Sequence, residues 1–193
     1  MDVKQPDDVD RDAVAASIGT PRSRSVTFGD KLRMSQGIAA NANVTEILMR
    51  EIPSAVSVTP AHSSNDRNGT DWWVECRGRS HLAVDAKVRE RPWTGDLALE
   101  TWSVVEFKKP GWTRDRNKRT DYIFWLWSDG RWCLVPFQLL LGAFEVKWES
   151  WSAKYKTAYQ TTRSSTGSWQ SQCVFVPVRD VWAEIYRRFS GAA

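Results

Sequence analysis

The sequence lacks the features that mark secreted, disulfide-bonded and membrane-spanning proteins. Its 193 residues include only three cysteines, Cys76, Cys133 and Cys173, an odd number at wide spacing. This usage argues against a disulfide framework and indicates a reducing compartment, so we expect a cytoplasmic protein. The longest apolar run, residues 139–144, is far shorter than the roughly 20 residues of a membrane span. The acidic N-terminus also lacks the apolar region of a secretion signal, so we expect no membrane partner.

The signatures of several enzyme classes are missing as well. The two histidines and three cysteines do not have the spacing of a zinc site. The sequence contains no glycine-rich phosphate loop, no nucleophile elbow and no internal repeat. These absences weigh against zinc enzymes, P-loop proteins and serine hydrolases. His81, expected opposite Glu75, is a weaker candidate for a general base, and we favour an exposed cross-strand pair with Glu75.

Basic and aromatic residues are plentiful. The net charge is +4, and it is uneven, because residues 77–91 and 108–119 are rich in lysine and arginine while the N-terminal segment is rich in aspartate. An uneven basic surface suits a polyanion. Most of the 12 tryptophans are expected in the core. Trp93, Trp112 and Trp169 fall in polar segments, where they either stack on bases or cap the core.

The apolar pattern divides the chain into a flexible tail, residues 1–27, and a single domain, residues 28–193. Helical spacing runs from about residue 30 to Ile52, and Pro53 ends that helix. Expected strands are 55–59, 71–76, 81–89, 97–105, 121–127, 131–136 and 173–177, and further expected helices are 137–144 and 178–189. No element is predicted in the polar residues 145–172. The order predicts an α/β (α+β) fold in which a central mixed sheet of roughly four to six strands is flanked by helices.

The strands expected at 71–76 and 81–89 form a predicted hairpin. In the second strand, apolar residues alternate with Asp85 and Lys87. A three-residue loop with a central glycine places Asp71 opposite Asp85. A slip of one residue would put the two aspartates on opposite faces of the sheet. The three-residue register therefore predicts that both acids and the lysine converge at one edge.

These groups suit phosphodiester hydrolysis with a Mg²⁺ ion. Mg²⁺ takes hard oxygen ligands and keeps several waters, so one or two carboxylates suffice. Asp71 and Asp85 are the candidate ligands, together with the backbone carbonyl of Ala86. Lys87 supplies a cation for the attacking water or for charge on the phosphate. Glu100, from the next strand, is a further candidate ligand or holds a metal-bound water.

Asp71, followed by Asp85, Ala86 and Lys87, resembles the PD-(D/E)xK (restriction-endonuclease-like) nuclease superfamily. In that superfamily an acid opens one strand of a hairpin, and an acid-x-lysine pattern follows in the next. Thr70 stands where the motif name has proline. The resemblance implies a core of four mixed strands flanked by helices. It also implies a Mg²⁺-dependent nuclease that acts on DNA, with Mn²⁺ as a substitute ion and with a homodimer as a common form.

The resemblance also extends the list of candidate residues. Many members carry an acid on the first helix, and Glu46 is the candidate here. The expected contacts to the DNA backbone come from basic residues at the end of the hairpin and before the strand at 121–127. These are Arg89, Arg91, Lys118 and Arg119.

Other interpretations remain open. A catalytically inactive module that binds nucleic acid or protein can use the same scaffold, and the basic segments favour it. The acidic tail suggests a host- or phage-encoded inhibitor of a protein partner. Asp85 and Lys87 are otherwise exposed residues of an edge strand. Residues 106–108 (Glu-Phe-Lys) form a second acid-x-lysine match without a suitably spaced partner acid.

Overall fold

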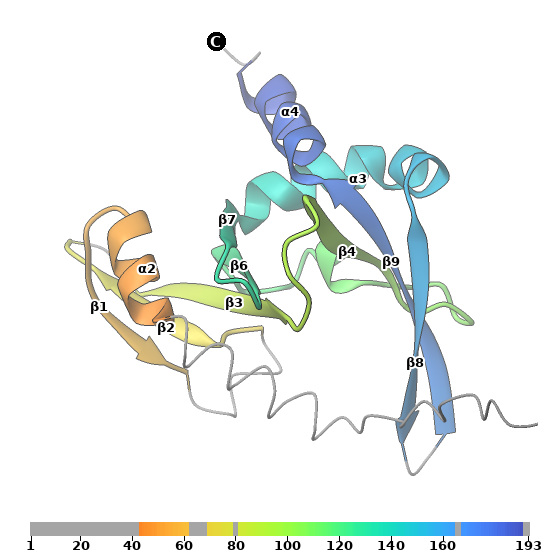
Figure 1. Cartoon of the computed structure of the whole chain (residues 1–193). Coiled ribbons are helices and arrows are strands. Elements are labelled where there is room, and N and C mark those ends of the chain that lie inside the picture. The colour runs from red at the N-terminus through yellow and green to blue at the C-terminus, as the bar shows by residue number, and fades with distance from the viewer. Residues whose placement is uncertain (1–42, 62–68, 79–80, 165–166, 191–193) are drawn as a thin grey trace, which may run out of the picture.

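The computed structural model describes residues 43–61, 69–78, 81–164 and 167–190 (Figure 1). The predicted tail, residues 1–27, lies outside the described residues, as does the start of the first predicted helix. The elements within the described residues are α2 (Val44–Glu51), β1 (Ala55–Pro60), β2 (Trp72–Cys76), β3 (Leu82–Arg89), β4 (Asp96–Val104), β5 (Lys109–Pro110), the 3-10 helix η3 (Trp112–Arg114), β6 (Tyr122–Trp127), β7 (Trp132–Pro136), α3 (Phe137–Lys154), β8 (Thr157–Ser164), β9 (Gly167–Pro177) and α4 (Val178–Phe189).

The central sheet is mixed and flanked by helices, as the sequence predicts. Its strands lie in the order β1-β2-β3-β6-β7. β1, β2 and β3 form an antiparallel meander, β3 pairs in parallel with β6, and β6 and β7 form an antiparallel hairpin. α2 lies over β1 and β2, while α3 and α4 lie on the far side of β6 and β7 (Figure 1). β3 is therefore an interior strand with a neighbour on each side.

The β2–β3 register is the one predicted from a three-residue loop. Trp72 pairs with Val84, and Val74 pairs with Leu82. The same register places residue 71, which directly precedes β2, opposite residue 85.

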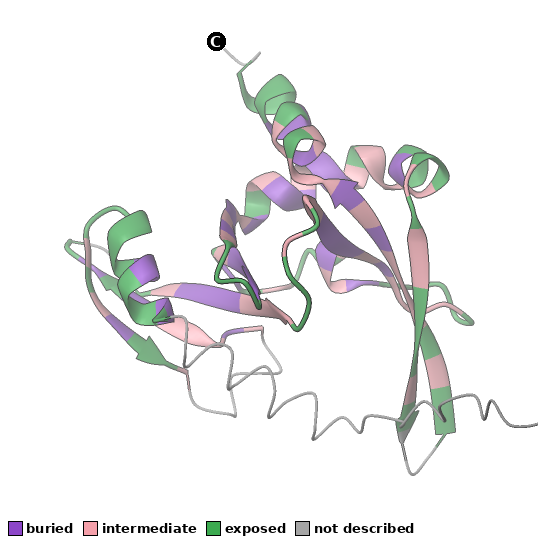
Figure 2. Ribbon diagram, viewed as in Figure 1, coloured by how far each residue is buried: buried purple, intermediate pink, exposed green. Residues whose placement is uncertain are grey.

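The remaining strands form a second sheet, which the sequence analysis did not predict. It is antiparallel, in the order β5-β4-β9-β8. β8 and β9 extend away from α4 as a two-stranded arm (Figure 1). The sequence pattern misses β8, the start of β9 and the last part of α3, all within residues 145–172. The outer part of the arm is polar and mostly exposed on both faces (Figure 2), so it lacks the apolar alternation by which a strand is recognised.

Two apolar clusters form the core, and β6 contributes to both. Ile123, Trp125 and Trp127 face the first cluster, which includes residues of β4, β9, α3 and α4. Phe124 and Leu126 face the second cluster, which lies under α2. Side chains alternate between the faces of a strand, so β6 is buried on both sides. Each such side chain contributes about 1.5–3 kcal/mol on burial, and β6 thereby joins the two halves of the core.

α2 is short, and the Asn43 side chain caps its first turn. Asn43 Oδ1 accepts a hydrogen bond from the Glu46 N–H at 3.3 Å, and Asn43 Nδ2 donates to the Glu46 carboxylate at 2.6 Å. The helix ends at Glu51, two residues before Pro53, because a residue that precedes proline disfavours the helical conformation.

Two structural findings concern the predictions about membrane spans and disulfide bonds. No helix among the described residues is long and apolar enough to cross a membrane. The three cysteines are free. Burial raises the pKa of Cys133 and of Cys173 to about 11, so both are neutral thiols at physiological pH.

α4 is attached to α3 through a buried carboxylate. Glu184 is 6% exposed, accepts a hydrogen bond from Arg187 Nε at 2.9 Å, and lies 3.7 Å from Lys147 Nζ of α3. The side-chain hydrogen bonds from Arg187 lower the pKa of Glu184 below its ordinary value.

Glu184→Gln is expected to lower the free energy of unfolding by about 1–2 kcal/mol at neutral pH. Because the folded-state pKa of Glu184 is lowered, its stabilisation is complete above the ordinary carboxyl pKa of about 4.3 and is lost as the pH falls through the folded-state pKa. The melting temperature of the variant, followed by circular dichroism, should therefore fall less steeply with acidification than that of the parent. The exposed control Glu90→Gln should keep the parent's slope. Equal slopes for the parent and Glu184→Gln would contradict this account.

Candidate active site

Asp85 and Lys87 project from the same face of β3. Leu82, Val84 and Ala86 belong to the cluster under α2, so the two charged residues lie on the opposite face, as the alternation predicts. Asp85 is only 2% exposed. Because β3 is an interior strand and Asp85 is buried, the alternative that these are exposed residues of an edge strand is wrong.

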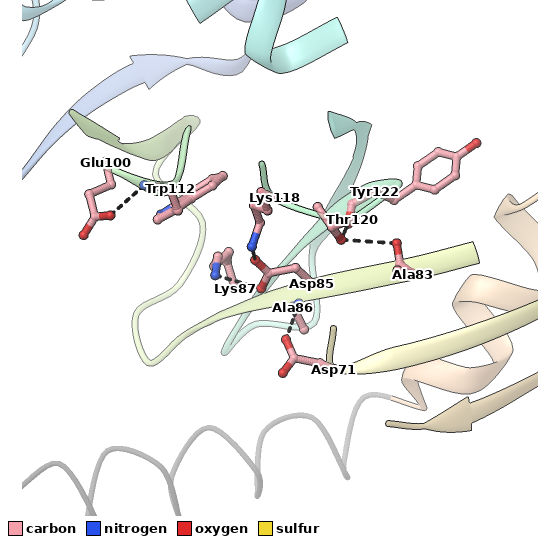
Figure 3. A network of polar contacts seen from close by, with 10 residues as sticks. All are labelled: Asp71, Ala83, Asp85, Ala86, Lys87, Glu100, Trp112, Lys118, Thr120 and Tyr122. Carbon is pink, nitrogen blue, oxygen red and sulfur yellow. Dashed lines mark hydrogen bonds and ion pairs between the residues drawn. The ribbon is translucent and has the colours of Figure 1, made fainter. Parts of the chain in front are cut away.

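Two ammonium groups hold the Asp85 carboxylate (Figure 3). Lys87 Nζ lies 2.7 Å from Oδ1, and Lys118 Nζ lies 2.7 Å from Oδ2. The Lys118 side chain is 8% exposed, against 26% for Lys87. Both distances are those of charge-assisted contacts between an ammonium and a carboxylate. Asp85 is thus a buried anion that depends on two nearby cations.

The segment that leads into β6 fixes the position of Lys118. Thr120 Oγ1 donates to the Ala83 carbonyl at 3.2 Å, and the Asp121 carboxylate accepts the Ala83 N–H at 2.7 Å (Figure 3 shows the first of these). Gly69 provides the space for the ammonium. Its φ is +72°, and a Cβ at this position would lie 1.8 Å from Lys118 Nζ. The positive φ therefore favours glycine, and a larger residue would also force the end of the Lys118 side chain to move.

Asp71 contacts the backbone of β3. Its Oδ2 accepts the Ala86 N–H at 2.6 Å, and its own N–H donates to the Val84 carbonyl at 2.9 Å. In Figure 3 Asp71 is directed at Ala86, while Asp85 is directed at Lys118. The second carboxylate therefore lies beside the residue that directly follows Asp85, and it receives one N–H from the β3 backbone.

Glu100 holds the turn that carries Trp112. Its Oε2 accepts the Trp112 N–H at 2.9 Å, and its own N–H donates to Thr113 Oγ1 at 3.0 Å. Gly111 lets the turn approach, because a Cβ there would lie 2.3 Å from the Glu100 carbonyl oxygen. Burial raises the pKa of Glu100, and the Trp112 N–H and the charge of Lys87 oppose that shift. Glu100 thus supports the turn and also lies within electrostatic reach of the lysine.

The Trp112 ring covers the two lysines. Lys87 Nζ lies 5.0 Å and Lys118 Nζ 6.0 Å from the ring centre, and the ring packs on Trp125 of the core. Both ammonium groups are thus within cation–π distance of the ring. Trp112 and Trp93 were predicted either to stack on bases or to cap the core, and both pack against the core.

The residues predicted to contact DNA differ in exposure. Arg91 and Arg119 are exposed. Arg89 is partly buried, and desolvation lowers its pKa, against the opposing effects of Cys173 and Asp96. Lys118, the remaining residue of this set, has its ammonium on Asp85 and not at the surface.

The structure does not gather all the predicted ligands. Among the described residues, no three acidic, histidine or cysteine side chains lie close enough to hold one metal ion. Glu46 is exposed and pairs with Asn43 at the start of α2. Glu100 is engaged with the Trp112 turn. Neither acid therefore joins the two aspartates in a larger acidic cluster.

Asp71 and Asp85 are the two carboxylates that a Mg²⁺ ion would use here. Oδ2 of Asp85 is buried, and its partner is the Lys118 ammonium, 2.7 Å away. The space beside this oxygen exists because Gly69 has no Cβ. Asp71 adds a second carboxylate from the adjacent chain segment. Mg²⁺ retains waters and needs only one or two protein carboxylates, so two such donors agree with that requirement in number.

Sequence reasoning missed two parts of this site. It assigned Lys118 to DNA and did not single out Gly69. Neither residue lies in a motif with Asp85, and Lys118 reaches the acid only because β6 pairs in parallel with β3. One available signal for Lys118 is the pair of polar residues before β6, Thr120 and Asp121. Their side chains form hydrogen bonds with Ala83 of β3 and so bring the preceding residues close to that strand.

Comparisons with protein-family models, with curated proteins and with solved structures give no significant match to this chain.

Glu100→Ala is expected to lower the free energy of unfolding by about 1 kcal/mol, because the Trp112 N–H loses its acceptor. Glu100→Gln keeps an acceptor oxygen and removes the buried charge. Because burial raises the Glu100 pKa, the penalty on the folded state is absent below the ordinary carboxyl pKa and complete above the folded-state pKa. The stability of Glu100→Gln relative to the parent should therefore increase as the pH rises from acid to neutral. Denaturant titrations at several pH values measure this, and a relative stability that falls with pH would refute it.

Proposed function

We propose that this protein is a Mg²⁺-dependent nuclease that hydrolyses DNA phosphodiester bonds, with Mn²⁺ able to replace Mg²⁺. The supporting observation is the Asp85 carboxylate, buried between two ammonium groups beside a second carboxylate on the neighbouring chain segment. The resemblance to the PD-(D/E)xK superfamily agrees with this arrangement. Asp71 precedes one strand and Asp85 and Lys87 lie on the next, within a mixed sheet.

The proposed roles follow from the contacts of each residue. Asp71 and Asp85 would hold the metal ion, with the carbonyl of Ala86 as a further oxygen. When bound, the ion supplies Lewis-acid stabilisation of charge on the phosphate and lowers the pKa of a bound water. Lys87 is the more exposed of the two lysines, so its ammonium can hold the attacking water or a phosphate oxygen. Trp112 shields the ammonium from solvent on one side.

The surface near the site carries basic groups that suit a DNA backbone. Arg91 and Arg119 are exposed, as are Lys108, in the connection from β4 to β5, and Lys109, the first residue of β5. The charge of Lys109 acts on Glu100, so this basic turn lies within electrostatic reach of the site. Contacts of this kind give affinity that falls as salt rises. A homodimer would let one assembly cut both strands of a duplex.

A second candidate is a catalytically inactive module that binds nucleic acid. It is favoured by the same ion pairs, because both oxygens of Asp85 already face an ammonium. Binding by such a module would depend strongly on salt and would not respond to Mg²⁺ or to a chelator.

The test is cleavage of supercoiled plasmid, linear duplex and branched DNA in Mg²⁺, in Mn²⁺ and in a chelator. The parent should cleave at least one substrate only when a divalent ion is present. Asp85→Asn and Lys87→Ala should each reduce the rate by about 100-fold or more, because each removes charge from the reacting centre. Product formation on gels gives the rates.

Two matched variants control for nonspecific effects of the substitutions. Asp129→Asn changes an exposed aspartate in the β6–β7 turn, and Lys154→Ala changes an exposed lysine at the end of α3. Both should cleave at the parental rate. Circular dichroism checks that Asp85→Asn remains folded, since it leaves two ammonium groups without their counterion. Parental rates in Asp85→Asn and Lys87→Ala, or cleavage that persists in chelator, would contradict the proposal.

A further inference from the structure

Lys118 is held more firmly than a lysine on a protein surface. Its side chain is 8% exposed, and Nζ occupies the space that a Cβ on Gly69 would fill. Its backbone is fixed as well, because its N–H donates to the Asp115 carbonyl at 3.2 Å and the residues that follow bond to Ala83. A long, flexible side chain loses conformational entropy when it is held in one place. The position of this ammonium is therefore a specific feature of the fold.

The ammonium occupies the place that a metal ion on Oδ2 would need. Lys118 Nζ lies 2.7 Å from Oδ2 of Asp85, in the space beside Gly69. A Mg²⁺ ion would approach the same oxygen to about 2.0–2.1 Å. A Mg²⁺ ion at that distance from Oδ2, on the side that Nζ occupies, would collide with the ammonium and be repelled by its charge, so occupancy of this place by one cation excludes the other.

We propose that Lys118 is a resident cation of the metal site, which neutralises Asp85 when no metal is bound and must leave Oδ2 before a divalent ion binds there. This inference rests on the proposed metal-dependent function and adds a competitor that sets the metal affinity. Lys118 is in this sense a positioning residue: its ammonium balances the charge of the buried carboxylate and occupies the place beside Oδ2 until an ion binds.

A displaced Lys118 has a second place close by. The Trp112 ring centre lies 6.0 Å from Nζ, and the charge of Glu100 also acts on this lysine. Movement toward the ring and Glu100 would keep the ammonium near an anion and over an aromatic face. Lys87, which pairs with the other oxygen, need not move for Oδ2 to become free.

A purely structural role for Lys118 gives the opposite expectation. If the lysine served only to neutralise Asp85, its removal would disturb the site, and a divalent ion would bind equally well or less well. Competition requires that removal of the ammonium makes the ion bind more tightly. The sign of the change in metal affinity therefore separates the two roles.

The experiment is isothermal titration of the metal-free, full-length protein with Mn²⁺ and with Mg²⁺, without DNA. Lys118→Met removes the ammonium and keeps an apolar chain of similar length. It should bind Mn²⁺ about tenfold or more tightly than the parent, within the usual range of coupling between two sites. Lys118→Gln serves the same purpose if the methionine variant does not fold. Unchanged or weaker affinity in the folded variants would overturn the proposal.

Two controls assign the effect to the space beside Oδ2. Lys154→Met changes an exposed lysine on α3 and should leave the affinity unchanged. Lys87→Met removes the ammonium on Oδ1, and its effect should be smaller than that of Lys118→Met. An equal or larger effect would mean that net charge alone controls the affinity, and would also overturn the proposal.

Nuclear magnetic resonance of ¹⁵N-labelled lysine gives a readout independent of affinity. In the metal-free protein the Lys118 ammonium should give a signal protected from exchange, and Lys118→Met identifies it by its absence. Saturating Mg²⁺ should remove or shift this signal. A Lys118 signal that stays unchanged while Mg²⁺ binds would overturn the inference.

Failure of this inference is distinguishable from failure of the proposed function. If the parent cleaves DNA in Mg²⁺ but Lys118→Met binds the ion no more tightly, the nuclease function stands and the role of Lys118 is wrong. If neither the parent nor Lys118→Met binds Mn²⁺ or Mg²⁺ and the parent does not cleave DNA, both are wrong.

Discussion

Burial of the Asp85 charge is the constraint on which the rest of the site depends. An isolated carboxylate in the interior is strongly disfavoured, so a buried one persists only with well-placed cations. One cation, Lys87, comes from the same strand, two residues away. The other, Lys118, comes from a distant part of the chain and requires parallel pairing of β3 with β6, the anchoring of Thr120 on β3, and a glycine at position 69. The charge balance of the site therefore depends on the topology of the sheet.

The second sheet contributes the cover of the site. β4 provides Glu100, whose carboxylate fixes the turn of η3, and that turn places the Trp112 ring against both lysines. An ammonium under an aromatic ring and partly screened from water interacts more strongly with a nearby anion than one in bulk solvent. The extra strands thus do more than enlarge the core, because they set the electrostatic environment in which Asp85 and its partners lie.

The sequence predicts the local parts of this arrangement well and the distant parts poorly. The β2–β3 register and the burial of Leu82, Val84 and Ala86 on one face follow from period-2 alternation and loop length, which are local properties. The second sheet does not follow, because the polar arm of β8 and β9 lacks apolar alternation. The role of Lys118 depends on which strands are neighbours in space, and a single sequence carries no direct record of that.

The stability of the fold does not by itself explain the charges around Asp85. A buried ion pair adds little stability over well-packed apolar residues of similar volume, so stability by itself does not account for an acid between two lysines. Asp71 lies beside the residue that follows Asp85, so two carboxylates stand against two ammonium groups. Each of these ammonium groups already faces Asp85, so the site has no unpaired positive charge for a phosphate, and under the proposed function a divalent cation would supply it. In that case the metal ion and the nucleic-acid backbone would favour each other's binding, because each supplies the charge that the other requires.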